Sequence, residues 1–191
     1  MKHGHSVKKN NHGYTLVELI VVIAIMSILV GGSSIGLSLL FSKDASSCAT
    51  RLNDAIYTTR MNSMSKAGNY TLKVDNTGSA NIATIKCTGV TPAISDTTIA
   101  LDDTQNTKKT SIKAYFATES DLASNLDGQE ITLPITIEFD KAKGSVKFDI
   151  DGDDADDAGV IIFKIHAERG GRDAKVQLVT TTGKHTIGEF K

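Results

Sequence analysis

The chain has 191 residues, 40% of them hydrophobic, and a formal net charge of −1. This length allows one modest domain with an appendage, and the charge offers no basic face for a nucleic-acid partner, so no nucleic-acid contact is expected. Two cysteines are too few for a disulfide-dense scaffold, and they lack the paired spacing of a zinc site.

The amino end, residues 1–13, reads MKHGHSVKKNNHG and carries three lysines and no acidic residue. A basic, acid-free stretch ahead of an apolar one stays on the cytoplasmic side of a membrane by the positive-inside rule. We therefore expect a cytoplasmic amino end.

An apolar segment, residues 14–42, follows, and residues 19–42 contain no charged side chain. About 24 residues make a helix of roughly 36 Å, which is enough to cross ~30 Å of hydrocarbon. The glycines and serines of residues 31–36 lower helix propensity and could form a soft joint. The segment is predicted to be a single transmembrane helix.

Glu18 lies at the start of this apolar segment, and three interpretations compete. The segment could be an ordinary secretory signal cut near residues 30–32, a plain membrane anchor, or a leader cut after Gly13. A carboxylate at the centre of a lipid-spanning helix costs about 2.5–3.5 kcal/mol. A secretory signal or a plain anchor therefore gains nothing from a carboxylate in its apolar segment. Cleavage after Gly13 would free an amine at Tyr14, and Glu18 of one copy could pair with that amine on the next and set the register of a filament.

The stretch KNNHGYTLVELIVVIAIMSILVGG resembles the class III signal of type IV pilins and type II secretion pseudopilins. The resemblance implies that a prepilin peptidase cuts after Gly13 and N-methylates Tyr14, which stands where the family usually has Phe. It makes Glu18 the assembly glutamate. It also implies these partners: other pilin or pseudopilin subunits, the peptidase, an inner-membrane assembly platform, and membrane lipid before assembly.

Residues 43–67 continue the helix with apolar or small residues at steps of three and four, an amphipathic pattern. Gly68 can take a left-handed conformation and end the helix. We expect one helix over about residues 14–66, or two helices with the soft joint between them.

The remainder, residues 68–191, has a period of two and is predicted to be an antiparallel β domain without a second domain. Three hairpins are expected: residues 70–74 with 80–87, the strands around residues 141–144, and those around 168–172. Pro134 suits an edge or a bulge. The fold class is therefore α+β, with the sheet packed on the amphipathic half of the helix. The resemblance to pilins implies that this fold is pilin-like.

Two further features resemble the H-type minor pseudopilins and FimT-like proteins. One is the helix end from Arg60 to Gly68 leading straight into a hairpin, and the other is the closing segment AKVQLVTTTGKHTIGEF. Major pilins, G-type pseudopilins and competence pseudopilins stay open as alternatives.

An Asp-rich segment, residues 149–157, packs six aspartates into nine positions. Asp149, Asp151 and Asp153 fall at the first, third and fifth places of an EF-hand-like loop and are candidate Ca²⁺ ligands. The sixth place is Asp154 instead of Gly and the twelfth is Val160 instead of Glu, so a solvated acidic loop is favoured. No other cofactor is predicted.

Cys48 and Cys87 are candidates for a disulfide from helix to sheet, since oxidation is allowed outside the cytoplasm; the alternative is two small buried thiols. His166 and His185 have no nucleophile motif or second metal ligand nearby, and no nucleotide fingerprint is present. The sequence therefore predicts no enzyme. It predicts a filament subunit, membrane-inserted and then at the cell surface or in the periplasm; the alternative is a secreted or anchored β-domain that binds a ligand.

Overall fold

A computed structural model describes residues 15–102, 108–123, 128–150, 153–155, 158–168 and 173–189. Within these ranges it describes only the backbone of residues 32–42, 119, 123, 149–150, 153–155 and 189. The chain divides into two compact units, Met1–Leu37 and Ser38–Lys191. The division falls inside the first helix.

The first helix, α1 (Leu16–Ser65), has 50 residues and is helical throughout, including residues 31–36. The prediction of one helix is confirmed, and the alternative of two helices is wrong. Gly68 has a φ of 98°, the left-handed conformation expected after the helix end. The strands then follow, with a short helix α2 (Glu119–Ala123) after the fourth of them. They are β1 (Asn69–Asp75), β2 (Ile82–Thr88), β3 (Thr97–Ala100), β4 (Thr110–Ala117), β5 (Gln129–Ile131), β6 (Ile135–Phe139), β7 (Val146–Ile150), β8 (Asp153–Ala155), β9 (Val160–Ala167), β10 (Ala174–Val179) and β11 (His185–Glu189).

The strands form two antiparallel sheets, where the sequence led us to expect one. The first sheet has the order β3-β2-β1-β6-β7-β8 and the second β11-β10-β9-β4-β5. The three predicted hairpins are confirmed, because β1 pairs with β2, β6 with β7, and β9 with β10. Pro134 lies between β5 and β6, where the chain leaves the second sheet for the first, so its expected place at an edge or bulge within a strand is wrong.

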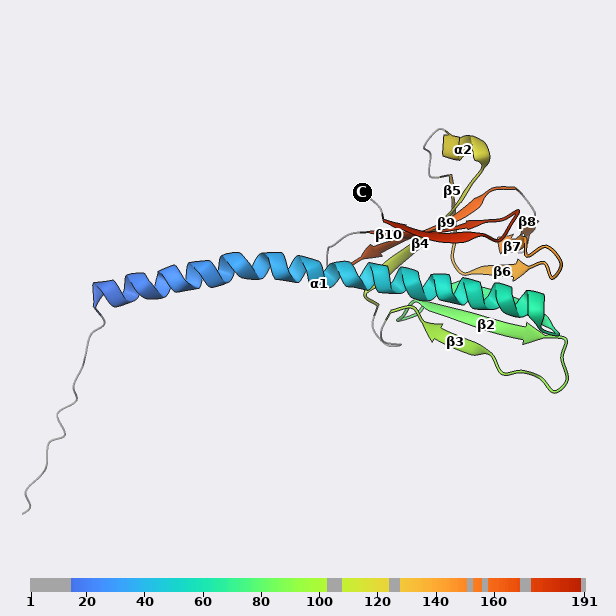
Figure 1. Cartoon of the computed structure of the whole chain (residues 1–191), viewed down its shortest axis with the longest axis horizontal. Coiled ribbons are helices and arrows are strands. Elements are labelled where there is room, and N and C mark those ends of the chain that lie inside the picture. The colour runs from blue at the N-terminus through green and yellow to red at the C-terminus, as the bar shows by residue number, and fades with distance from the viewer. Residues whose placement is uncertain are drawn as a thin grey trace, which may run out of the picture. The chain divides into compact units, whose positions relative to one another are not determined.

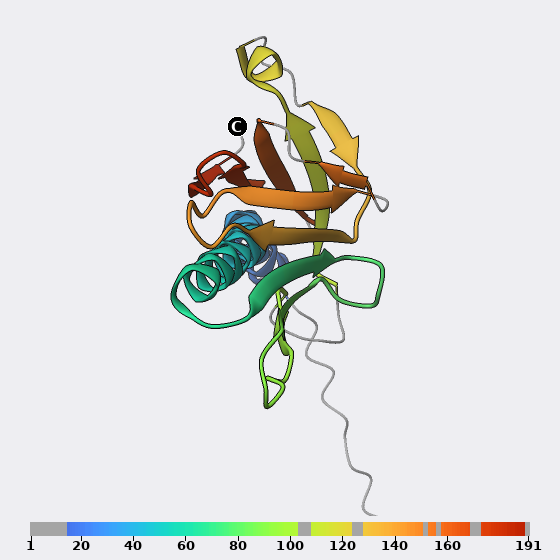
Figure 2. The same cartoon turned by 90° about the vertical axis from the view of Figure 1, so that its right-hand side faces the viewer.

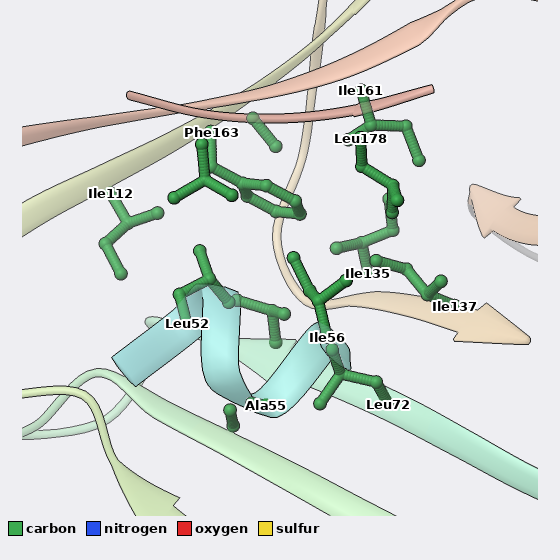
Figure 3. Close-up of a cluster of buried hydrophobic side chains, with 14 of the residues drawn as sticks. Leu52, Ala55, Ile56, Leu72, Ile112, Ile135, Ile137, Ile161, Phe163 and Leu178 are labelled. Atoms are coloured by element: carbon green, nitrogen blue, oxygen red, sulfur yellow. The ribbon is translucent and has the colours of Figure 1, made fainter. Parts of the chain in front are cut away.

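The core of the second unit lies between the carboxyl-terminal half of α1 and both sheets (Figures 1 and 2). Leu52 and Ile56 are fully buried, and Figure 3 shows them among side chains from the two sheets, such as Ile112 and Phe163 of the second and Ile135 of the first. The buried positions of α1 recur at three- and four-residue steps, so the predicted amphipathic face is confirmed. They are Ala45, Cys48, Ala49, Leu52, Ala55, Ile56, Thr59 and Ser63.

The two sheets are tied together at one end of the second unit. The Val146 N–H donates to the Thr180 carbonyl at 2.7 Å, which links β7 to the turn after β10. Arg60 of α1 donates from Nη2 to the Thr182 carbonyl at 2.9 Å. Gly183 has a φ of 63°, and a Cβ there would lie 2.0 Å from the carbonyl oxygen of Gly144. The close approach of these two turns therefore requires glycine.

Candidate processing and assembly segment

The start of α1 is a capped helix terminus. Thr15 precedes the first helical residue, and its carbonyl accepts the first helical hydrogen bond, from the Leu19 N–H at 3.2 Å. The Thr15 hydroxyl accepts a hydrogen bond from the Glu18 N–H at 3.3 Å. Thr15 is therefore the N-cap residue and Glu18 the third helical residue, which is the arrangement of a capping box.

This cap gives Glu18 a local role that the sequence reasoning missed. A carboxylate in the first turn of a helix interacts favourably with the positive end of the helix dipole. The signal was present in the printed sequence as Thr15-x-x-Glu18 ahead of an apolar run. The cap explains why an acidic residue suits this place in the helix. This explanation requires no contact with a second copy of the chain.

The large apolar side chains of residues 16–30, on both sides of Glu18 in the sequence, are exposed around α1. Leu16 is 76% exposed and Ile28 75%, and even the least exposed of the group, Val22, is 48% exposed. Such a surface needs an apolar covering, because a helix that is hydrophobic all round is normally buried. The group consists of Leu16, Val17, Leu19, Ile20, Val21, Val22, Ile23, Ile25, Met26, Ile28, Leu29 and Val30. In the part of the chain that the structure describes, no helix meets the length and hydropathy needed to cross a membrane.

Two of the predicted processing residues, Gly13 and Tyr14, lie outside the described residues. Of the three, the structure therefore places Glu18 alone. It lies on the first turn of α1, and its carboxylate is exposed.

The chain thus combines a capped helix, whose first part exposes apolar side chains, with an α+β domain. Residues 8–34 match the model of one family, described as the prokaryotic N-terminal methylation motif. No curated protein and no solved structure is detectably similar to the chain. The chain thus carries a prokaryotic N-terminal methylation motif, which spans the end of the basic amino-terminal stretch and the start of α1.

The candidate calcium ligands fall largely outside the described residues. Asp151 lies outside them altogether, and Asp149 and Asp153 are described in the backbone alone, on β7 and β8, which pair as a hairpin. Among the residues whose side chains the structure describes, no group of three or more acidic, histidine or cysteine residues could hold a metal ion.

The candidate disulfide is not formed, which corrects the interpretation of Cys48 and Cys87 as partners. Both are free and buried. Cys48 faces the second sheet, where its Sγ lies 3.4 Å from the Thr110 hydroxyl oxygen. Cys87 belongs to the first sheet and packs beside Gly68. Burial raises the pKa of the Cys48 thiol to about 12, which suits a structural and unreactive thiol.

Cys48 adjoins a buried polar network that was not predicted from the sequence. Asn81 donates from Nδ2 to the Asp102 carboxylate at 2.9 Å, and the Thr110 hydroxyl donates to the other Asp102 oxygen at 2.8 Å. Asp102 is 3% exposed. These bonds compensate the burial of the carboxylate and fix the residues after β3 against β4.

His166 and His185 occupy structural positions. His166 Nδ1 contacts the Asp173 carboxylate, its neighbour across the β9–β10 hairpin. His185 Nδ1 lies 3.2 Å from the Gly183 carbonyl, and its ring packs against Tyr57 with the centroids 6.0 Å apart. Both environments are those of residues that hold a hairpin in place.

Proposed function

We propose that the chain is a structural subunit of a type IV pilus-like or type II secretion pseudopilus filament. The proposal rests above all on one observation, the methylation motif over residues 8–34, which coincides with the capped start of α1. The chain is made as a precursor, cut by a prepilin peptidase after Gly13, and methylated at Tyr14. It is not an enzyme and needs no cofactor.

The exposed apolar side chains of residues 16–30 suit a helix that contacts lipid first and neighbouring helices later. Before assembly they contact membrane lipid, with the amino end in the cytoplasm and the β domain outside. The assembly platform of the inner membrane then moves the subunit into a filament in the periplasm or at the cell surface, where neighbouring helices replace lipid. This exchange costs little, because both coverings are apolar.

Glu18 is the residue that makes the two environments unequal. In lipid its charge is unfavourable. In the filament it pairs with the methylated amine of Tyr14 on the adjacent subunit, and each charge compensates the burial of the other. The Thr15 cap places Glu18 in the first turn of α1, four residues after Tyr14 in the sequence.

Within the family, the finer assignment that we propose is an H-type minor pseudopilin. Two features favour it: the hairpin β10–β11 with Gly183 in its turn, and the direct passage from α1 into the hairpin β1–β2. A competence pseudopilin, which takes part in DNA uptake, shares the same amino-terminal segment and is the neighbouring possibility.

The amino-terminal residue of the mature protein tests the proposal. The full chain is produced with and without a prepilin peptidase, and its terminus is determined by mass spectrometry. The proposal predicts that Tyr14 becomes the first residue and carries one extra methyl group only when the peptidase is present. A Gly13→Ala variant is the matched control and should stay uncut.

The second candidate function is a secreted or membrane-anchored β domain that binds a ligand outside any filament. Its support is the self-contained core of the second unit. For that function the mature chain would begin near Ser33 or keep Met1. Either terminus, found in cells that hold the peptidase, contradicts the filament proposal.

A further inference from the structure

The first sheet ends in an edge strand, β3, which pairs with β2 on one side (Figure 1). Just beyond the paired residues, the Leu101 N–H donates to the Asn81 carbonyl at 2.9 Å, so these two residues form a hydrogen-bonded pair. In an antiparallel ladder such pairs alternate with pairs whose N–H and C=O groups point away from the partner strand. The backbone groups of Thr98 and Ala100 are therefore directed to the free edge of β3.

Thr98 is the residue that this edge offers to another chain. The Ala100 carbonyl already accepts a hydrogen bond from Arg51 Nη1 of α1 at 3.1 Å. Thr98 is exposed, and no strand of the described residues lies beyond it. An unpaired strand edge is a template on which another strand can form hydrogen bonds.

The other sheet edges carry charge, and β3 does not. The edge strands are β3 and β8 of the first sheet and β11 and β5 of the second. Asp153 and Asp154 lie in β8, Glu130 in β5 and Glu189 in β11. Charged residues are a usual means of preventing edge pairing. The sequence of β3, Thr-Thr-Ile-Ala, contains none, so its edge is the least protected of the four.

A pocket of about 280 Å³ lies beside this edge, between α1 and the inner face of β2 and β3. Thr97 and Ile99, alternate residues of β3, line it together with Ile85 of β2 and Ile94. Ile94 is 49% exposed, so part of the apolar wall meets solvent. Lys66 is the one charged residue among those that line the pocket, which favours a carboxylate over an ammonium group on an occupant.

The edge and the pocket together select an extended polypeptide as the occupant. In strand addition, main-chain hydrogen bonds to the edge provide affinity, and pockets for alternate side chains provide specificity. A small molecule would fill the pocket and leave the backbone of Thr98 without a partner. Pairing of β3 with β3 of a second copy would be two-fold symmetric and would close after two chains, so it could not propagate along a filament.

We propose that β3 binds an extended segment of a different protein as an added strand. The segment forms a hydrogen-bonded pair with Thr98 and places apolar side chains at two alternate positions, beside Thr97 and Ile99. It also carries a carboxylate within reach of Lys66. The contact involves the β domain alone and requires neither cleavage nor assembly, so it goes beyond the proposed filament function.

Amide hydrogen exchange of the full chain in detergent micelles tests the proposal with a defined probe. The probe is an acetylated peptide of alternating valine and threonine that begins with glutamate. Saturating probe should slow exchange of the Thr98 amide by about tenfold or more, whereas the Ile99 amide, which already bonds to β2, should change little. Two control peptides should give no protection: one of the same composition with its valines adjacent, and one N-methylated at every amide.

A substitution at Thr98 separates the free edge from the fold. Thr98→Pro removes an N–H that faces away from β2, and proline is tolerated on the free side of an edge strand. Thr98→Val keeps that N–H and is the matched control. Fluorescence anisotropy of labelled probe should show binding about tenfold or more weaker for the proline variant, with the thermal midpoint retained.

Charge exchange at Lys66 gives a second test that does not depend on the proline variant folding. Lys66→Glu should bind the glutamate probe several-fold more weakly and should prefer a probe that begins with lysine. Equal binding by all variants, equal binding of the control peptides, or protection at β5 or β11 in place of Thr98 would overturn the proposal. Protection of Thr98 that grows with protein concentration in the absence of peptide would assign the edge to a second copy and would also overturn it. These outcomes are separate from the position of the mature terminus.

Discussion

The two halves of α1 differ in whether their apolar side chains are exposed or buried. In the first half every large apolar side chain from Leu16 to Val30 is at least 48% exposed, whereas in the second half Leu52 and Ile56 are fully buried. The first half is apolar all round, and the second has a single apolar face of small and medium residues. One helix therefore combines a segment that needs an external apolar covering with a segment that completes its own domain.

The largest expected effect on stability comes from a substitution in the core of the second unit. Leu52→Ala leaves a cavity between α1 and both sheets and should lower the free energy of unfolding of the β domain by about 2–5 kcal/mol. Ile25→Ala, at a position that is 54% exposed, is the matched control in the first half and should leave that free energy unchanged. Urea unfolding of the full chain in detergent measures both. Equal losses would contradict the division of the helix.

A second test concerns the end where the sheets meet. Gly183→Ala places a Cβ against the Gly144 carbonyl and should cost about 1–3 kcal/mol through overpacking in addition to the strain of a positive φ. Gly89→Ala carries similar strain, with a φ of 78°, but meets no atom within 4 Å. The thermal midpoint of the first variant should fall further than that of the second.

The helix cap gives a smaller effect in the first half. Thr15→Val removes the hydroxyl that accepts from the Glu18 N–H and should destabilise the first turn by about 1 kcal/mol, while Thr15→Ser keeps the cap. Hydrogen exchange of the Glu18 and Leu19 amides measures the change. Unfolding of the β domain should be the same for both variants, and a difference there would contradict the separation of the two regions.

The smallest effect is a pH dependence in the second unit. Backbone N–H groups of Lys143 and Ala142 donate to Asp140 at 2.7 Å and 2.9 Å, and these bonds hold the pKa of Asp140 below its usual range. A lowered folded-state pKa contributes stability above the unfolded value of about 3.9, and this contribution is lost as the pH falls through the folded value. The thermal midpoint of Asp140→Asn should thus lie a little below wild type at pH 7, and the gap should narrow as the pH falls below the unfolded value. A constant gap would contradict the assigned bonds.

Sequence periodicity was sufficient for α1 and for three hairpins, because their partners are local. The change from a continuous apolar run to steps of three and four, followed by Gly68, predicted the helix and its end. The division into two sheets could not be predicted, since it depends on which distant strands pair. Leu133 and Pro134 read as part of one strand, although the chain changes sheets there.

The residues of the candidate site also differ in whether the sequence alone could reveal them. Glu18 stood out in the sequence because a charge in an apolar run is rare, and Thr15 was missed although its spacing from Glu18 was readable. The strand register places Lys113, Lys164 and Lys175 side by side although up to 62 residues separate them in sequence, and this neighbourhood could not be predicted from the sequence. The buried hydrogen bonds of Asp102 with Asn81 and Thr110 also depend on tertiary structure.

Assembly of the Glu18→Gln variant tests the central claim most directly. Gln at this position preserves the capping box and removes the charge, so the helix start, the cleavage after Gly13 and the β domain should remain as in wild type. The account predicts that sheared filament fractions from cells with the complete assembly machinery contain wild-type chain but almost none of the variant. Normal amounts of the variant in those fractions would show that Glu18 serves the helix cap alone and would contradict pairing with the amine of a neighbouring subunit.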